Sequence, residues 1–270
     1  MVPLPPVSLP IPISDVDDPR LADYRHLKER QLNAESGRFI AESERVVRRL
    51  LESRLRVHSV LATPTRLGTL ADALAASAVR GDAPFPIYVA AQPIMDAIAG
   101  FHVHRGCLAV GQRPENATIP PDARTLVVLE DLVDADNLGA IVRNAAALGA
   151  DVLCLSPACA DLFYRKAIRV SIGSVFLLPI VRFTHWPDDL LTLRTAGFTL
   201  VAATPRPTAV PLPTYRRPEK LALLLGTEGP GLSESVLALA DQQVSIPMSP
   251  AADSLNVATA GAVLLYHLNH

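Results

Sequence analysis

The glycines that follow the apolar run Leu221–Leu225 are the first residues of this chain that could do chemistry. They lie in the sequence Gly226, Thr227, Glu228, Gly229, Pro230, Gly231, and an apolar helical pattern from Ser233 to Ala240 comes next. This order predicts a strand, a glycine turn and a helix. Because open α/β sheets bind ligands beyond the carboxyl ends of their strands, the turn is a candidate binding loop.

A second candidate loop lies nearer the C-terminus. The segment 243–246 predicts a short strand, and Pro247 and a polar stretch follow it. Ser254, Leu255 and Asn256 then open an apolar helix that reaches His267. We expect both loops at the same edge of one sheet. Ordinary turn chemistry explains either loop taken alone, and plain helix capping is the simpler role for Ser254 and Asn256.

A nucleotide-dependent oxidoreductase is one alternative for a glycine-rich loop. The glycines here are spaced G-x-x-G-x-G, whereas a dinucleotide-binding turn has G-x-G-x-x-G. They also come late in the chain, without an acidic residue about twenty positions further on. The spacing therefore disfavours a dinucleotide site.

A third group of polar residues lies on a helix earlier in the chain. The run 125–129 predicts a strand, and 138–148 predicts a helix that Asn137 could cap and Gly149 could end. Asn137, Gly139 and Arg143 fall within the first two turns of this helix, so we expect them near one strand end. A solvated helix arginine is the alternative role for Arg143.

Composition narrows the class of protein. The chain of 270 residues is long enough for two domains, and no apolar run is long enough to span a membrane. Its three cysteines form no C-x-x-C pair, so neither a disulfide framework nor a metal site is indicated. Six prolines in residues 1–19 predict an extended, flexible tail without the features of a secretory signal. We expect a cytoplasmic protein.

The charge is distributed unevenly although the net charge is only −2. Between Arg20 and Arg56, ten basic residues stand against six acidic ones, an excess of four. The 25 basic residues of the chain are all arginine except Lys28, Lys166 and Lys220. Arginine suits phosphate contacts and stacking on bases, although genomic base composition explains its abundance equally well.

The region 20–111 has the pattern of a small α/β/α domain. Helices are expected over 21–33, 43–51, 70–79 and 93–99, and strands over 38–41, 57–62, 85–89 and 107–110. Ser43 is a candidate cap of the second helix. The residues 112–123 hold three prolines and no periodicity, which indicates an interdomain linker before a second domain over 124–270.

The polar groups described above carry a resemblance to a known family. In order and spacing they are similar to the three motifs of the SpoU (TrmH-like) family of RNA ribose 2'-O-methyltransferases, in the SPOUT superfamily. The matching segments are Asn137-x-Gly139-x3-Arg143, Leu225-Gly226-x-Glu228-Gly229-x-Gly231, and Ile246-Pro247-Met248 with Ser254-Leu255-Asn256-Val257-Ala258. The stretch 166–173 also looks like the family's segment between the first two motifs.

The N-terminal region resembles the ribosomal-protein-L30e-like substrate-binding domain that many family members carry. The similarity rests on Arg38-Phe39-Ile40-Ala41-Glu42 and Arg105-Gly106-x-x-Ala109. Ser43 departs from the pattern, because the family often has glycine there. The resemblance implies RNA contacts from this domain, at Arg25, Lys28 and Arg30, and from Arg165, Lys166 and Arg169 beside the active site.

For the second domain the resemblance implies an α/β fold with a deep trefoil knot, an exception to the rule that chains are unknotted. It also implies S-adenosyl-L-methionine as the cofactor, held by backbone groups of the crossing loops. Glycines let those groups approach the adenosine without an intervening Cβ. The implied cofactor residues are Ala203, Thr204, Leu225, Gly226, Thr227, Gly229, Gly231, Ile246, Pro247, Met248, Ser254, Leu255 and Ala258.

The implied reaction moves a methyl group to a ribose 2'-hydroxyl of structured RNA, with ribosomal RNA favoured over transfer RNA. Arg143 is the implied catalytic residue, and Asn137, Glu228, Ser254 and Asn256 complete the site. A guanidinium has a pKa above about 12, so we interpret Arg143 as a clamp for phosphate and developing alkoxide instead of a base. A homodimer through the C-terminal domain is also implied. A catalytically silent RNA-binding module of the same fold is the remaining alternative.

Overall fold

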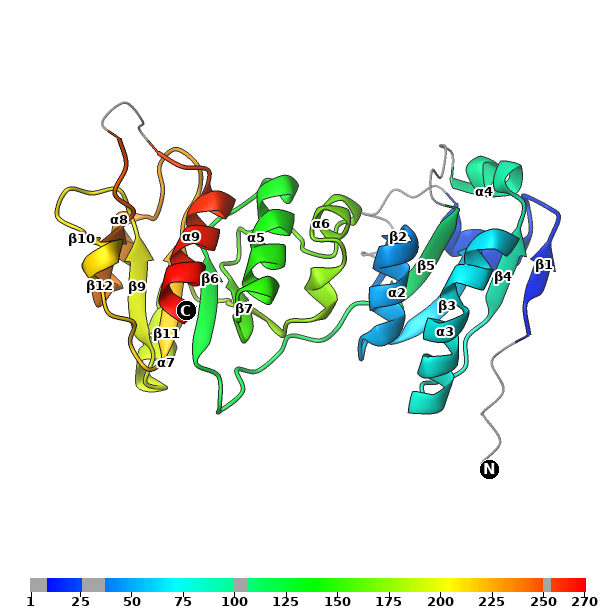
Figure 1. Ribbon diagram of the computed structural model, residues 1–270, viewed down its shortest axis with the longest axis horizontal. Coiled ribbons are helices and arrows are strands. Elements are labelled where there is room, and N and C mark those ends of the chain that lie inside the picture. Colours follow the sequence, from blue (N-terminus) through cyan, green and yellow to red (C-terminus); the bar gives the residue numbers. More distant parts are fainter. Residues whose placement is uncertain (1–8, 26–36, 100–105, 250–253) are drawn as a thin grey trace. The chain divides into compact units, whose positions relative to one another are not determined.

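The structure is a computed structural model that describes residues 9–25, 37–99, 106–249 and 254–270 (Figure 1). The chain divides into two compact units. The first comprises the residues up to Pro114 together with Phe163–Phe176, and the second comprises Glu115–Leu162 and Leu177–His270. The first unit thus ends inside the expected linker, but it also takes a segment that we expected in the C-terminal domain.

A five-stranded mixed sheet forms the first unit, with the order β1-β4-β3-β5-β2. β4 is parallel to β1 and β3, whereas β5 is antiparallel to β3 and β2. The strands are β1 Ile11–Ile13, β2 Arg38–Glu42, β3 Val57–Ala62, β4 Ile87–Ala90 and β5 Cys107–Gln112. The helices are η1 Pro19–Tyr24, a 3-10 helix, and α2 Glu44–Glu52, α3 Pro64–Arg80 and α4 Gln92–Ala99. The prediction of an α/β unit is confirmed.

Two predictions for the N-terminal residues are corrected by the structure. The expected flexible tail contains β1, which pairs with β4 at the edge of the sheet, where the missing N–H of Pro12 is tolerated. The helix expected over 21–33 begins as the short η1, in which Leu21 and Tyr24 are fully buried. The remainder of that expected helix, after Arg25, lies outside the described residues.

The residue before α2 adopts an unusual backbone conformation. Ser43 has φ +88°, in the left-handed region that favours glycine, and its side chain makes no cap hydrogen bond. The prediction that Ser43 caps the helix through its side chain is therefore wrong. Glycine, which the resemblance of the N-terminal region implies at this position, would adopt this positive φ without strain.

The segment Phe163–Phe176 packs within the first unit through aromatic and polar contacts. The ring of Phe39 on β2 lies 5.1 Å from that of Phe163 and 5.3 Å from that of Phe176. Arg49 on α2 donates hydrogen bonds of 2.7 Å to the carbonyl of Ile172 and to Oγ of Ser174. Helix α6, Arg165–Val170, is part of this segment, as is the 3-10 turn η2, Ser174–Phe176.

The second unit is built on a seven-stranded sheet in which every recorded pairing is parallel. The strand order is β10-β12-β9-β11-β6-β7-β8. The strands are β6 Thr125–Leu129, β7 Val152–Leu155, β8 Ile180–Arg182, β9 Thr199–Ala203, β10 Val210–Pro211, β11 Leu221–Leu225 and β12 Gln242–Ser245. The helices are α5 Ala135–Ala147, α7 Asp189–Thr195, α8 Glu234–Leu239 and α9 Val257–Asn269, and a 3-10 turn, η3, spans Leu212–Thr214.

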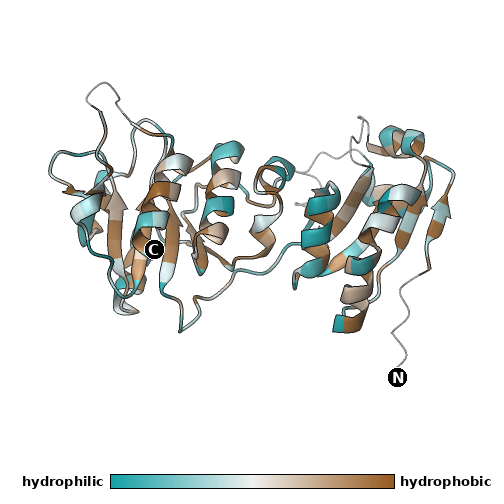
Figure 2. Cartoon of the chain, in the orientation of Figure 1, coloured by the Kyte–Doolittle hydropathy of each residue, from teal (hydrophilic) through white to brown (hydrophobic). Residues whose placement is uncertain are grey.

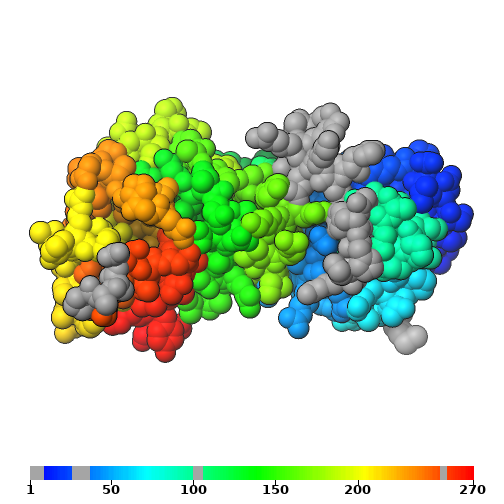
Figure 3. All heavy atoms as spheres, turned by 90° about the horizontal axis from the view of Figure 1, so that it is seen from above, coloured from blue at the N-terminus to red at the C-terminus, as the bar shows by residue number. Residues whose placement is uncertain are grey.

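Helices cover both faces of this sheet, which explains its continuously apolar central strands. One face packs against α7 and α8 through residues such as Leu190 and Val236. The other is covered by α5 and α9, which lie side by side in Figures 1 and 3. Figure 2 shows the central strands largely in brown, whereas the helices carry both teal and brown residues. Among the described residues, no helix combines the length and apolarity that a membrane span requires.

Candidate active site

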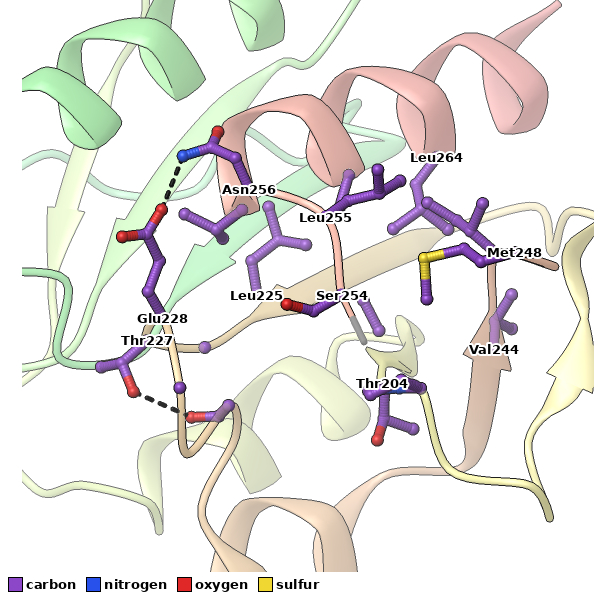
Figure 4. A pocket seen from close by; sticks show the side chains of 18 residues that line it. Thr204, Leu225, Thr227, Glu228, Val244, Met248, Ser254, Leu255, Asn256 and Leu264 are labelled. Carbon is purple, nitrogen blue, oxygen red and sulfur yellow. Dashed lines mark hydrogen bonds between the residues drawn. The ribbon is translucent and has the colours of Figure 1, made fainter. Parts of the chain in front are cut away.

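A cavity of about 390 Å³ opens where β9, β11 and β12 end and α9 begins (Figure 4). Three loop segments and the inner side of α9 form its walls. The lining residues are Ala203, Thr204, Pro205, Leu225, Gly226, Thr227, Glu228, Gly229, Gly231, Val244, Ile246, Met248, Ser254, Leu255, Asn256, Val257, Ala260 and Leu264. The two loops singled out in the sequence therefore meet at one site, at the sheet edge where ligands are expected.

The glycine turn that follows β11 is closed by two hydrogen bonds between its own backbone groups. The backbone N–H of Thr227 donates to the carbonyl of Gly231 at 3.2 Å, and the N–H of Gly231 donates back at 3.1 Å. A Cβ on Gly226 would lie 2.3 Å from the carbonyl carbon of Gly231, so no other residue fits there without moving backbone. Gly231 itself has φ +74°, which favours glycine.

A cluster of amides and a carboxylate lies on one side of the cavity. Nδ2 of Asn256 donates to Oε1 of Glu228 at 2.6 Å and to Oδ1 of Asn137 at 2.8 Å (Figure 4 shows the first of these bonds). Oδ1 of the same Asn256 accepts from the N–H groups of Ala258 and Thr259 and so caps α9. The cap fixes which end of the amide faces Glu228.

The lining has the chemistry for a nucleoside with a positive charge. Leu225, Val244, Met248 and Leu264 give an apolar surface, as Figure 4 shows, and Glu228 is the one ionisable side chain among the described residues of the lining. Because none of these described residues is a lysine, arginine or histidine, they offer a pyrophosphate no cation. The residues present fit S-adenosylmethionine, a cationic sulfonium, better than a dinucleotide.

Most of the residues expected to hold a cofactor line this cavity. All of the thirteen do so except Pro247, which lines a neighbouring hollow, and Ala258. Among the expected catalytic residues, Glu228, Ser254 and Asn256 are part of the lining and Asn137 contacts Asn256. The cavity is also lined by residues that were not expected from the sequence, namely Pro205, Val244 and the helix positions Val257, Ala260 and Leu264. The spacing of those last three, i, i+3 and i+7, would have revealed one face of the helix.

Arg143 lies apart from this cluster within the second unit. It is exposed on α5, is not among the lining residues, and has no hydrogen bond or ion pair with any described residue. Its neighbour Asn144 faces α9 and donates from Nδ2 to the carbonyl of Ala258 at 2.9 Å. Successive helical residues differ by about 100°, so Arg143 does not share the side-chain direction of Asn144. Asn137 and Asn144, one heptad apart, share the face of α5 that contacts α9 and the residue before it.

Helix α5 also begins earlier than the sequence pattern indicates. Asp134 is the N-cap, and its side chain accepts from the N–H groups of Asp136 and Asn137. The prediction that Asn137 caps the helix is therefore wrong, and its amide is available to contact Asn256 instead. Gly149 does end the helix, with φ +82°.

The basic residues expected to contact RNA belong to the first unit where the structure describes them. Arg25 is half-buried and donates to the carbonyl of Asp18, whereas Lys28 and Arg30 lie outside the described residues. Arg165 lies 3.8 Å from a carboxylate oxygen of Glu42. Arg169 is exposed on α6, and the neighbouring Lys166 is half-buried.

Acidic partners offset part of the positive excess in the N-terminal region. Arg38 pairs with Asp23, and Arg48 pairs with Asp72. Hydrogen bonds from the Arg20 side chain and backbone lower the pKa of Asp18 to about 2. The exposed Arg45, Arg54 and Arg56 remain as the basic residues of this region best placed for phosphate.

The cysteines do not form a reactive or metal-binding site. Burial raises the pKa of both Cys107 and Cys154 to about 12, and it also raises that of Cys159. A thiol with a raised pKa is a poor nucleophile near neutral pH. In the part of the chain that the structure describes, no group of three or more His, Cys, Asp or Glu side chains could hold a metal ion.

Comparison with known proteins identifies the class of this protein: the all-parallel α/β unit with the cavity at its sheet edge is that of an RNA methylase. A model of the SpoU rRNA methylase family matches residues 124–266. The chain is also 42% identical, over 94% of its length and 90% of the relative's, to an uncharacterized tRNA/rRNA methyltransferase of Mycobacterium tuberculosis. The chain belongs to the SpoU rRNA methylase family.

Characterised relatives and solved structures agree with this assignment over nearly the whole chain. The 23S rRNA (guanosine(2553)-2'-O)-methyltransferase RlmP of Bacillus subtilis is 27% identical over 95% of this chain and 98% of its own. An AdoMet-bound rRNA methyltransferase from Sinorhizobium meliloti has a TM-score of 0.81 at 25% identity, covering 96% and 97% of the two chains. The SpoU methyltransferase AviRb of Streptomyces viridochromogenes, in complex with AdoMet, has a TM-score of 0.76 at 27% identity. This match covers 93% of this chain and 97% of the AviRb chain.

Proposed function

We propose that this protein transfers a methyl group from S-adenosylmethionine to a ribose 2'-hydroxyl of structured RNA, with ribosomal RNA as the substrate class. The observation that carries the proposal is the joining of Asn137, Glu228 and Asn256, from three distant segments, beside a cation-free cavity. The names of RlmP and of the AdoMet-bound neighbours support the reaction and the cofactor. Their substrates favour ribosomal over transfer RNA.

The cavity residues have distinct tasks in holding the cofactor. Leu225, Met248 and Leu264 would hold the adenosine through apolar contacts, and backbone groups of the turn Gly226–Gly231 would contact its polar edges. S-adenosylmethionine supplies an electrophilic methyl group on a sulfonium that is already a good leaving group. The enzyme must therefore mainly align the acceptor oxygen and help its proton leave.

Glu228 and Asn256 act on the acceptor side. Asn256 holds Oε1 of Glu228, which fixes the carboxylate and leaves Oε2 to accept a hydrogen bond from the ribose hydroxyl. Asn137 accepts the second proton of the Asn256 amide and so completes its orientation. Ser254 lines the cavity beside them and supplies a further hydroxyl for the acceptor nucleotide.

Arg143 has the role of an electrostatic clamp. A guanidinium keeps its proton near neutral pH, and contact with a phosphate would strengthen that preference. Its planar fork suits a bidentate contact with the target phosphate while it stabilises the developing alkoxide. The exposure of Arg143 and its lack of partners among the described residues leave the fork available for RNA.

The remaining parts of the proposal concern assembly and recognition. The protein is a cytoplasmic homodimer that associates through its C-terminal unit, for which the exposed Val263 and Tyr266 on α9 provide an apolar surface. The L30e-like unit reads RNA with its exposed arginines and α6. The knotted path of the second domain stays a prediction from the family resemblance.

Two measurements test the proposal. Calorimetry on the purified protein should detect binding of S-adenosylmethionine, and 2'-O-methyl mapping of RNA from cells with and without the protein should reveal a missing site in ribosomal RNA. A folded sample that does not bind the cofactor would exclude the reaction. Binding without turnover on any RNA fraction would instead favour the catalytically silent module, and light scattering would settle the dimer.

A further inference from the structure

Both ends of the glycine turn are held by one residue, Glu130, which follows β6. Its backbone N–H donates to the carbonyl of Leu225, directly before Gly226, at 2.9 Å. Its carboxylate accepts from Ser233, two residues after Gly231, through Oε2 to the backbone N–H at 2.8 Å and Oε1 to the hydroxyl at 2.7 Å. The entry and the exit of the turn are thus tied to the same point of the sheet.

Glu130 is only 4% exposed, and its partners are neutral donors. The third of them is the indole N–H of Trp186, which donates to Oε1 at 2.9 Å. Trp186 is the single tryptophan of the chain, and its ring stacks on Phe183 with centroids 5.7 Å apart. Burying a carboxylate costs free energy unless its oxygens accept hydrogen bonds. A glutamate at this buried position, with three donors around it, therefore has a specific positional task.

We infer that Glu130 is a positioning residue that holds the glycine turn in its cofactor-binding shape, and that Trp186 senses this state through the shared carboxylate. The inference rests on the proposed use of S-adenosylmethionine. The cofactor contacts the turn, the turn leads into Ser233, and Ser233 and Trp186 meet at Oε1 of Glu130. Binding in the cavity therefore changes the hydrogen bond to the indole and with it the tryptophan emission.

Glutamine cannot replace Glu130 in this arrangement, although it has nearly the same size. Oε1 and Oε2 both accept hydrogen bonds, whereas a glutamine side chain has one acceptor oxygen and one NH₂ donor. In one orientation the NH₂ would face the backbone N–H of Ser233, and in the other it would face the N–H of Trp186. Either orientation leaves one of these donors without its acceptor, faces it with a second donor, and loosens one end of the network.

The test compares Glu130→Gln with Glu115→Gln, a change at an exposed glutamate. We expect Glu130→Gln to weaken S-adenosylmethionine binding by about tenfold in calorimetry, as losing a buried charged hydrogen bond implies. The Michaelis constant for the cofactor should rise while that for RNA stays unchanged. Glu115→Gln should match the wild type. A Glu130→Gln variant that is folded and binds within twofold of wild type overturns the inference.

Tryptophan emission gives a second readout that a purely structural role would not move. Cofactor titrated into the wild type should change the Trp186 emission with the same dissociation constant that calorimetry gives. Ser233→Ala keeps the backbone N–H but removes the hydroxyl donor, so it should shrink the change even if Glu130→Gln fails to fold. An unchanged wild-type emission at saturating cofactor overturns the inference. A wild type that does not bind the cofactor would instead contradict the proposed function.

Discussion

Asn256 faces Glu228 with its amide nitrogen, 2.6 Å from Oε1, because its own Oδ1 is already used to cap α9. One side chain therefore serves the helix and the active site at once. The start of α9 fixes the direction of the Asn256–Glu228 hydrogen bond, and that bond in turn fixes the carboxylate beside the cavity. This dual use makes the two functions of Asn256 separable by substitution.

The first prediction separates these functions through Asn256→Asp. Aspartate also caps helices well, so stability should change little, but an oxygen would replace the donor that faces Glu228 and Asn137. We expect kcat to fall by about 10-fold, in line with the loss of a hydrogen bond to a charged group. Asn256→Ala should lower both kcat and the free energy of unfolding, the latter by about 1 kcal/mol. Wild-type turnover in the aspartate variant would contradict the proposed role.

The second prediction concerns the tight approach at Gly226. In Gly226→Ala the new methyl group would meet backbone atoms of Gly231 and Leu232 within 2.4 Å, and backbone cannot move aside as a flexible side chain can. We expect cofactor binding to be lost in calorimetry. Gly229→Ala is the matched control, since its Cβ would meet nothing within 4 Å and only the positive φ adds strain, of about 1–2 kcal/mol. Equal affinity in the two variants would refute the argument.

The third prediction is that Arg143→Ala abolishes turnover and leaves the affinity for S-adenosylmethionine nearly intact. Arg143 is exposed and lies outside the cavity lining, so the cofactor should not sense its removal. Single-turnover kinetics and calorimetry on the same sample would separate the two effects. Arg143→Lys keeps the charge but loses the planar fork, and wild-type activity in that variant would disprove the bidentate clamp.

The fourth prediction concerns a fragment that begins near Pro121. It contains Phe163 and Phe176, which are at most 8% exposed and pack against Phe39, a residue that the fragment lacks. We expect the fragment to bind S-adenosylmethionine, because the cavity lies within the second unit, yet to self-associate through the uncovered rings. Light scattering and calorimetry measure the two properties. Replacing both phenylalanines with serine should restore solubility.

The same fragment tests which unit reads RNA. Phosphate contacts release counterions, so RNA binding by the intact protein should weaken steeply with salt, and residual binding by the fragment should weaken less. The soluble serine variant of the fragment is the form to compare with the intact chain. An unchanged Michaelis constant for RNA and an unchanged salt slope would show that residues 20–111 are not the RNA reader, and recognition would then be assigned to Arg165, Lys166 and Arg169, which the fragment keeps.

The sequence by itself determined the strands and turns whose signals are local. The predicted strands 57–62, 125–129 and 221–225 have those bounds in the structure, and the last two are apolar or nearly so throughout. A continuous apolar run of this length indicates a strand buried on both faces, and glycine spacing indicates a turn. The family motifs predicted most of the residues that line the cavity, because each motif is also a local signal that lies in one short stretch of chain.

Only the tertiary structure decided how distant segments combine. Asn137 meets Asn256 across 119 positions, and Glu130 meets Ser233 across 103. Ile11–Ile13 forms a strand despite Pro12 because β4 provides an edge for it to pair with, and Phe163–Phe176 belongs to the first unit because Phe39 and Arg49 provide partners. Periodicity reports which side of an element is buried, but the burying partner is set by the path of the whole chain.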